Sequence, residues 1–243
     1  MYSGTGIYSV QEASRLIGVP GRDIRRWLFG YHYLKTPGEA SSRIYMPPLL
    51  ASELANEDFD EDVLGFRDLL ELRFIHEFTQ HGVPTQVIRR CLKNATDLYG
   101  VSHPMTLPSF KTDGKTIYAE ALHEEAKDNS LVDLKSRQSV FKDIIRPSLY
   151  VGIVYTADRK HASKWYPGAS RNRRSPIVID PERQFGTPII EKTGTPTSVI
   201  YASYLAEGAS PDARAVTARV YDVPPRDVDI AIRFEETLQR PLH

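Results

Sequence analysis

The start of the fold is decided by the stretch YSVQEASRLIGVPGRDIRRWLFG, residues 8–30. Ser9 is followed three residues later by Glu12, which is the pattern of a capping box at the start of a helix. Apolar residues then recur at helical spacing until Gly18-Val19-Pro20 ends that helix. A second helix is predicted from about Pro20 to Phe29. The stretch therefore predicts two short helices joined by a tight turn, which is a helix-turn-helix pattern.

Three arginines of the second helix are spaced so that they can share one face. A short helix with long donors on one face suits the DNA major groove, because Arg can donate two hydrogen bonds to guanine or bridge phosphates. Arg22, Arg25 and Arg26 are therefore the predicted DNA-binding residues of this helix. The alternative is a solvated basic face on a helix with a purely structural role. Trp27 is predicted to pack in the core.

A hairpin is predicted from Tyr31 to Tyr45, because its residues favour strands and Pro37-Gly38 favours a turn. It stands where the wing of a winged helix-turn-helix would stand. Arg43 and Tyr45 are predicted to contact DNA phosphates, and an equally good reading of Tyr45 is that it closes a small core.

The chain between the hairpin and residue 175 mixes helical and strand signals. A helical turn is predicted at 49–54, helices at 63–81 and 85–99, and a β-hairpin from Phe110 to Tyr118 with Asp113-Gly114 as its turn. A helix is predicted at 138–145 and a strand at 149–155. The stretch from Arg159 to Arg174 reads as irregular and basic.

The last third predicts two short strands followed by three helices. The strands are expected near 176–181 and 185–190. The first helix is expected to begin with Thr195 as its cap and Pro196 at its first position, and the other two to begin at Ser210-Pro211 and at Pro224-Pro225. Arg226 and Arg233 could make the last helix a second DNA reader. Four acidic residues on the same helix oppose binding to phosphates, so a protein-binding or dimerising role is favoured. They are Asp227, Asp229, Glu235 and Glu236.

Composition bounds the function class. The 243 residues carry 31 Lys and Arg against 31 Asp and Glu, a formal net charge of +0, which argues against a protein that coats any nucleic acid. The single cysteine, Cys91, excludes an intrachain disulfide and favours the cytoplasm. No apolar run approaches the roughly 20 residues that a membrane-spanning helix needs. No membrane partner is expected.

The sequence contains no motif typical of an enzyme. His76 and His81 resemble a zinc helix motif, but they lie five residues apart and so do not share a helical face. No phosphate-binding loop, dinucleotide fingerprint or nucleophile elbow is found. We therefore expect no catalytic residue, no metal and no cofactor, and we expect Cys91 in the core.

Residues 8–19, the Ile24-Arg25-Arg26-Trp27 segment and Arg43-Ile44-Tyr45 resemble the opening of MerR-type regulators. Segments 72–73, 82–84 and 88–89 resemble the helices that follow the wing in that family. The likeness covers roughly residues 7–98. It implies a DNA-binding winged helix-turn-helix.

The C-terminal third is similar to a small domain common in bacterial antitoxins. The likeness rests on segments 185–190, 193–197, 208–210, 220–223 and 227–234. The whole arrangement resembles long antitoxins of the VapBC class, which are paired with PIN-like ribonuclease toxins. This resemblance implies a protein that neutralises such a toxin and represses its own operon by binding double-stranded operator DNA. A homodimer is expected, because one recognition helix reads too few base pairs.

The basic stretch before residue 175 could bind DNA or the acidic metal-binding site of the toxin that the resemblance implies. The candidate toxin-binding residues are Trp165, Tyr166, Arg171, Arg173 and Arg174. The alternative is a flexible solvated linker.

We predict an α+β fold that is mainly α. Residues 1–100 would form the MerR-like winged helix-turn-helix, 101–175 a small β-containing middle, and 176–243 a C-terminal helix-turn-helix-like domain. Two other functions stay open. One is a one-component MerR-like transcriptional regulator that responds to a small ligand, and the other is a small-molecule enzyme.

Overall fold

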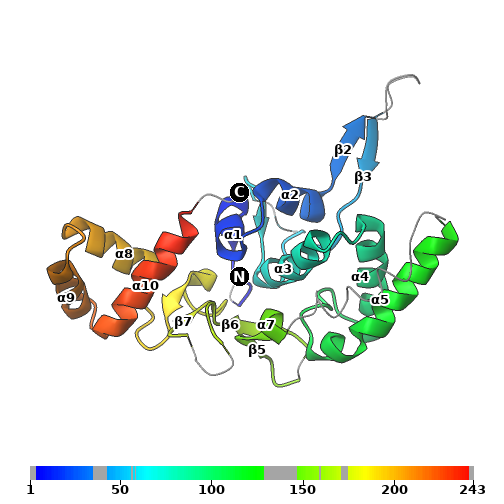
Figure 1. Ribbon diagram of the computed structural model, residues 1–243. Helices are drawn as coiled ribbons and strands as arrows, with labels where there is room; N and C mark the ends of the chain where they lie inside the picture. Colours follow the sequence, from blue (N-terminus) through cyan, green and yellow to red (C-terminus); the bar gives the residue numbers. More distant parts are fainter. Residues whose placement is uncertain are drawn as a thin grey trace.

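The computed structural model describes residues 4–34, 43–55, 57, 59–128, 147–158, 160–170 and 175–240. The fold mixes helices with short antiparallel strand pairs and is mainly helical, which confirms the expected α+β class (Figure 1). The elements that precede residue 129 are β1 (Tyr8–Ser9), α1 (Val10–Ile17), α2 (Gly21–Phe29), β2 (Tyr31–Leu34), β3 (Arg43–Met46), β4 (Val63–Leu64), α3 (Phe66–Gln80), α4 (Thr85–Tyr99) and α5 (Pro108–Asp128). The later elements are α7 (Pro147–Tyr150), β5 (Ile153–Tyr155), β6 (Ala162–Trp165), β7 (Ile177–Val178), η1 (Gln184–Gly186), β8 (Ile189–Ile190), α8 (Thr197–Ala206), α9 (Pro211–Val220) and α10 (Pro225–Leu238).

The first two helices form as their sequence predicts. Ser9 Oγ accepts from the backbone N–H of Glu12 at 3.2 Å, and the Glu12 carboxylate accepts from the Ser9 N–H at 2.8 Å. This capping box starts α1, and Gly18 ends it in the left-handed conformation, with φ of 70°. Helix α2 buries Ile24 and Trp27 against the core, as expected for Trp27.

Strands β2 and β3 pair antiparallel, with Tyr31 opposite Met46 and Leu34 opposite Arg43. The pair confirms the predicted hairpin, and it projects from the body of the molecule (Figure 1). The predicted turn at Pro37-Gly38 lies outside the described residues. We call the β2–β3 pair the hairpin.

Helix α3 lies at the centre of the N-terminal core, and two predictions next to it were wrong. Val63 and Leu64 form strand β4 against β1 instead of opening α3. Residues 49–54 form bends and turns instead of a helical turn. For residues 49–54 the reason is a contact with α3, because the backbone N–H of Glu53 donates to the carboxylate of Asp68 and is not available to a helix.

The predicted hairpin at 110–118 was also wrong, because these residues lie within helix α5. Phe110, Ile117, Tyr118, Ala121 and Leu122 are all buried. Their spacing is helical, and the face they form packs along α4. Burial of this face outweighs the turn preference of Asp113-Gly114, since a glycine inside a helix costs only about 1 kcal/mol.

The middle of the chain keeps a small β component. Strand β5 pairs with β6 across an irregular register, and α7 occupies the first part of the predicted strand at 149–155. Strand β6 also lies inside the stretch that was expected to be irregular. Trp165 and Ile179 exchange backbone hydrogen bonds of 2.9 and 2.8 Å, which joins β6 to the C-terminal segment. The helix predicted at 138–145 lies outside the described residues.

The C-terminal segment consists of the β7–β8 pair and helices α8, α9 and α10, which pack on one another around a second apolar cluster. Helix α9 begins at Ser210-Pro211 as predicted, and Ser210 Oγ caps it by accepting from the Ala213 N–H at 3.1 Å. The expected cap at Thr195 was wrong. Thr195 bonds instead to the hydroxyl of Thr193 at 2.9 Å, and Pro196 precedes α8 without a side-chain cap.

The C-terminal segment packs against the first residues of the chain. Ile7 N–H donates to the carbonyl of Phe185 at 3.2 Å, and the Tyr8 hydroxyl donates to the carbonyl of Gly186 at 2.9 Å. These bonds bring α10 close to α1 (Figure 1). In the described part of the chain, no helix combines the length and the apolar character that crossing a membrane requires.

Candidate functional site

The three predicted arginines of α2 lie on its solvent side, away from the buried Ile24 and Trp27. Arg22 Nε lies 3.4 Å from a carboxylate oxygen of Asp23, its neighbour in the chain. Arg25 Nε lies 3.3 Å from a carboxylate oxygen of Asp62, with 58% of the arginine side chain exposed. The Arg26 guanidinium lies 4.9 Å from the centre of the Tyr31 ring. All three arginines are therefore accessible.

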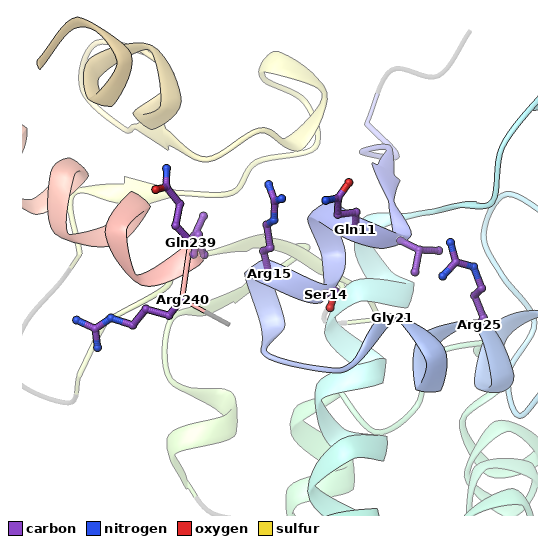
Figure 2. A pocket seen from close by; sticks show the side chains of 9 residues that line it. Gln11, Ser14, Arg15, Gly21, Arg25, Gln239 and Arg240 are labelled. Carbon is purple, nitrogen blue, oxygen red and sulfur yellow. The ribbon is translucent and has the colours of Figure 1, made fainter. Parts of the chain in front are cut away.

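An open groove of about 750 Å³ lies beside these arginines, between α1, the start of α2 and the end of α10. Figure 2 shows its length, from Arg240 at one end, past Arg15, to Arg25 at the other. The described residues that line it include three arginines and no acidic residue. We call it the arginine groove. Its lining residues are Val10, Gln11, Ser14, Arg15, Gly21, Arg25, Leu238, Gln239 and Arg240.

Two carboxylates near the arginine groove are already engaged, one of them with a groove arginine. Asp62 faces Arg25, and Glu12 is held by both the backbone N–H and the hydroxyl of Ser9, each at 2.8 Å. Arg15 and Arg240 are exposed and form no ion pair with any residue that the structure describes. The groove is therefore positively charged. No sequence pattern points to this groove, because its walls come from opposite ends of the chain.

The hairpin presents Arg43 and Tyr45 to solvent. Tyr45 is 51% exposed and its ring centre lies 5.0 Å from that of His32 on the neighbouring strand. This exposure argues against the reading in which Tyr45 closes a core. Arg43 is also exposed, so both side chains are available to a partner.

The base of the hairpin is fixed to the body on both sides. Gly30 joins α2 to β2 with φ of 74°, and a Cβ on this residue would lie 2.5 Å from the carbonyl oxygen of Met46. On the other side, the Arg89 guanidinium of α4 donates to the carbonyls of Pro47 at 2.7 Å and Pro48 at 2.5 Å. The hairpin is thus placed by the helices that carry it.

The predicted toxin-binding residues do not form one surface in the described part of the chain. Trp165 and Tyr166 are 6% and 4% exposed, so little of either side chain is available to a partner. Trp165 stacks under the guanidinium of Arg73, with 4.3 Å to the ring centre. Tyr166 donates a hydrogen bond to the carboxylate of Glu191. The other three candidates, Arg171, Arg173 and Arg174, lie outside the described residues.

A buried polar cluster around Asp68 was missed by the sequence reading. The Asp68 carboxylate accepts from Ser52 Oγ at 2.7 Å, from the Gly65 N–H at 2.9 Å and from His103 Nε2 at 2.8 Å. Glu71, one helical turn later, accepts from the backbone N–H groups of Met105 and Thr106 at 3.0 and 3.2 Å. The cluster ties the loop after α4 to α3.

Burial and charge shift two groups of this cluster. Burial raises the pKa of Glu71 to about 7, although the positive charge of His103 opposes the rise. Burial alone would lower the pKa of His103, but the hydrogen bond and charge of Asp68 outweigh burial and raise it. His103 is 4% exposed and Asp68 is fully buried, so no substrate reaches this pair in the folded chain.

The remaining candidates for catalysis or metal binding have structural roles. His81 Nδ1 lies 2.8 Å from the carbonyl oxygen of Glu77, and the His76 ring lies near Trp27. Cys91 is buried, which raises the pKa of its thiol and confirms its place in the core. The described residues contain no group of three or more His, Cys, Asp or Glu that could hold a metal ion.

A second cavity, of about 220 Å³, lies between α1 and the C-terminal segment and shares Arg15 with the arginine groove. Tyr8 and Leu16 line it on one side, and Thr197 and Glu235 line it on the other. Glu235 accepts a hydrogen bond from the Thr197 hydroxyl, and burial raises its pKa. The cavity is small, and among the described residues that line it Tyr8 is the one aromatic residue.

Comparison with known proteins gives three likenesses. Residues 177–234 match a family described as a protein of unknown function, DUF433. A Mycobacterium tuberculosis (strain ATCC 25618 / H37Rv) protein named "Putative antitoxin VapB45" is 28% identical over 199 residues, which cover 77% of this chain and 78% of that protein. The crystal structure of Rv2018 from Mycobacterium tuberculosis superposes with a TM-score of 0.62 at 22% identity, covering 96% of this chain and 100% of that one.

These likenesses bear on different questions. The likeness to the protein named "Putative antitoxin VapB45" confirms the resemblance to VapBC-class antitoxins that the sequence motifs indicated. The likeness to Rv2018 extends over nearly the whole chain, and at its level of identity it concerns the fold alone.

Proposed function

We propose that this chain is an antitoxin that neutralises a PIN-like ribonuclease toxin and represses its own operon by binding double-stranded DNA as a homodimer. The observation that carries the DNA-binding part is the exposed arginine face of α2, formed by Arg22, Arg25 and Arg26. The similarity to a protein named as a VapB antitoxin supports the toxin-binding part. Both activities belong in the cytoplasm.

In this proposal α1, α2 and the hairpin act as a MerR-like winged helix-turn-helix, with the hairpin as its wing. Helix α2 enters the major groove, and its arginines contact guanine edges or phosphates. A bidentate contact between Arg and guanine contributes about 1–3 kcal/mol of discrimination between base pairs. Arg43 and Tyr45 contact phosphates and set the register.

The ion pairs of the arginines do not prevent this role. The Arg25–Asp62 pair is about half exposed on both sides, and exposed pairs of this kind contribute at most about 1 kcal/mol. Arg26 keeps its donors while its guanidinium faces the Tyr31 ring. Exchanging such partners for a phosphate or a base edge therefore costs little.

The proposed toxin-binding surface is the basic stretch before residue 175. Arg171, Arg173 and Arg174 remain candidates, since an arginine can neutralise the clustered carboxylates of a metal-dependent nuclease. Trp165 and Tyr166 are not retained, because their side chains are buried. Dimerisation through the C-terminal segment would place two reading helices on two half-sites.

One observation favours a second candidate function, a one-component regulator that responds to a small ligand. The 220 Å³ cavity lies against α1, so a ligand there could alter the reading helices. Against this, pockets for small ligands are usually larger, at about 300–1,000 Å³, and lined mainly by apolar and aromatic residues. An enzyme is disfavoured because the Asp68–His103 pair is closed to solvent.

The test of DNA binding is fluorescence anisotropy of the full chain on its own upstream DNA and on a scrambled duplex. We expect tight binding to the upstream DNA alone, and loss of that preference in Arg25→Ala/Arg26→Ala. Arg219→Ala is the matched control, because Arg219 is an equally exposed arginine on α9. A folded wild-type protein that binds neither duplex would remove the DNA-binding part of the proposal.

The toxin-binding part needs its own measurement. The product of the neighbouring gene is assayed for ribonuclease activity with and without this chain. We expect inhibition that saturates at a fixed stoichiometry. Full nuclease activity in the presence of excess chain would contradict the antitoxin role.

A further inference from the structure

We propose that the arginine groove binds the phosphate backbone of the same DNA duplex that α2 reads, so that Arg240 at the end of α10 belongs to the DNA interface. This inference rests on the proposed function. It extends the predicted contacts on α2 and the hairpin to a residue more than two hundred positions away in the sequence.

The groove is continuous with the reading helix. Arg25 belongs to both, since it lies on the exposed face of α2 and lines one end of the groove. Arg15 in the last turn of α1 lies between Arg25 and Arg240 (Figure 2). A DNA strand that runs past α2 therefore meets three guanidinium groups in succession.

The lining chemistry fits phosphate better than other ligands. The described lining residues add the amides of Gln11 and Gln239 to the arginines and contain no carboxylate. A guanidinium presents paired donors that match the oxygens of a phosphate, and it stays charged at every physiological pH. The groove is open and carries charged and amide groups along its length, which does not suit an apolar ligand.

Arg15 and Arg240 are free to bind an anion. Neither forms an ion pair with a described residue, and both are exposed at the rim of the groove. Glu12, the nearest acidic residue along α1, is engaged by Ser9 in the capping box. Two like charges facing one groove repel each other, and a bound phosphate relieves that repulsion.

The position of Arg240 depends on the contact between the two ends of the chain. The Tyr8 hydroxyl donates a hydrogen bond to the carbonyl of Gly186. Leu238 and Gln239 line both the arginine groove and the smaller cavity, which Leu16 also lines. The C-terminal segment thus serves DNA binding through one end of α10. Its acidic residues Asp227 and Asp229 lie about three turns back from that end. Glu235 and Glu236 lie about one turn from Arg240, and Glu235 accepts a hydrogen bond from the Thr197 hydroxyl outside the lining of the arginine groove.

The test is the salt dependence of DNA binding by the full chain, measured by anisotropy on the upstream and scrambled duplexes. Each phosphate contact that is lost lowers the slope of log affinity against log salt by about 0.9. We expect this decrease for Arg240→Ala and for Arg15→Ala, together with a severalfold loss of affinity on both duplexes. Arg240→Lys keeps the charge and is expected to keep the slope, and Arg219→Ala is expected to change neither quantity.

The outcomes separate this inference from the proposed function. If Arg240→Ala and Arg15→Ala keep the wild-type slope while Arg25→Ala/Arg26→Ala loses the upstream preference, the groove does not bind DNA and the proposed function stands. If the wild-type chain binds no duplex, both fail. If Arg240→Ala weakens toxin inhibition and leaves DNA binding unchanged, the groove is a protein-binding surface and the inference is wrong.

Discussion

The hydroxyl of Tyr8 donates a 2.9 Å hydrogen bond to the carbonyl of Gly186, and this bond spans 178 positions of the sequence. Gly186 has φ of 82°, and a Cβ on it would lie 2.1 Å from the Tyr8 hydroxyl oxygen. Burial raises the pKa of the Tyr8 hydroxyl, which keeps its proton available for donation. This contact joins the start of α1 to the segment that leads into α8 and α10.

Tyr8→Phe is expected to lower the free energy of unfolding by about 1 kcal/mol, because the carbonyl of Gly186 loses its donor. Gly186→Ala is expected to lower it further, since the new methyl group clashes with Tyr8. Urea denaturation measures both. Tyr33→Phe is the control, because Tyr33 is 43% exposed on the hairpin. A Tyr8→Phe chain as stable as the wild type would show that the bond contributes nothing.

Gly30→Ala is expected to displace the hairpin, because the added Cβ would lie 2.5 Å from the Met46 carbonyl. Gly82→Ala is the matched control. Gly82 has a similar φ of 72°, but a Cβ there meets nothing within 4 Å. In both variants the positive φ destabilises the folded chain by about 1–2 kcal/mol. Only Gly30→Ala is expected to weaken DNA binding. Anisotropy on the upstream duplex distinguishes them, and equal affinities would contradict a role for the hairpin position.

Arg43→Ala is expected to weaken binding to the upstream and scrambled duplexes by the same factor, because a phosphate contact carries no sequence information. Arg25→Ala should instead lower the ratio between the two affinities, since a lost guanine contact costs about 1–3 kcal/mol of discrimination. The measurement is the affinity ratio at one fixed salt concentration. A change of ratio in Arg43→Ala would mean that the hairpin reads bases.

Stability is expected to fall as the pH rises, through two buried groups. Glu71 has a pKa of about 7 in the folded chain and 4.5 when unfolded, so its contribution is present below pH 4.5 and is lost as the pH rises to about 7. His103 has a folded pKa above 6.5, so its contribution is present below pH 6.5 and is lost as the pH rises through the folded value. Urea midpoints between pH 4.5 and 8 measure this slope.

His103→Ala should remove the upper part of the slope and lower the free energy of unfolding by about 3–5 kcal/mol, because it breaks a buried pair. His123→Gln is the control, since His123 is exposed on α5. If the midpoint of His103→Ala keeps the wild-type dependence above pH 6.5, His103 is not the group that titrates.

The elements that the sequence predicted well are those with local signals. The Ser9–Glu12 box and Gly18 define α1 within ten residues, so no distant contact is needed to place it. The Asp113-Gly114 pair shows the opposite case. The turn preference of this pair is local. Helix α5 forms because Phe110 and Ile117 bury their side chains on α4, and this contact cannot be read from the few residues around Asp113-Gly114.

The candidate site divides in the same way. Arg22, Arg25 and Arg26 could be found because helical spacing alone puts them on one face. Arg15 and Arg240 could not be paired from the sequence, because only the packing of the C-terminal segment brings them to one groove. Asp68 and His103 are 35 positions apart and were missed for the same reason.

The hydrogen bonds from Arg89 to the carbonyls of Pro47 and Pro48 connect α4 to the base of the hairpin. Helix α4 packs along α5, and the outer side of α5 is exposed, as at Lys111 and Lys115. The guanidinium of Arg89 therefore links the first residues after β3 to a pair of packed helices. The position of the hairpin depends on the packing of α4 against α5 as well as on α2.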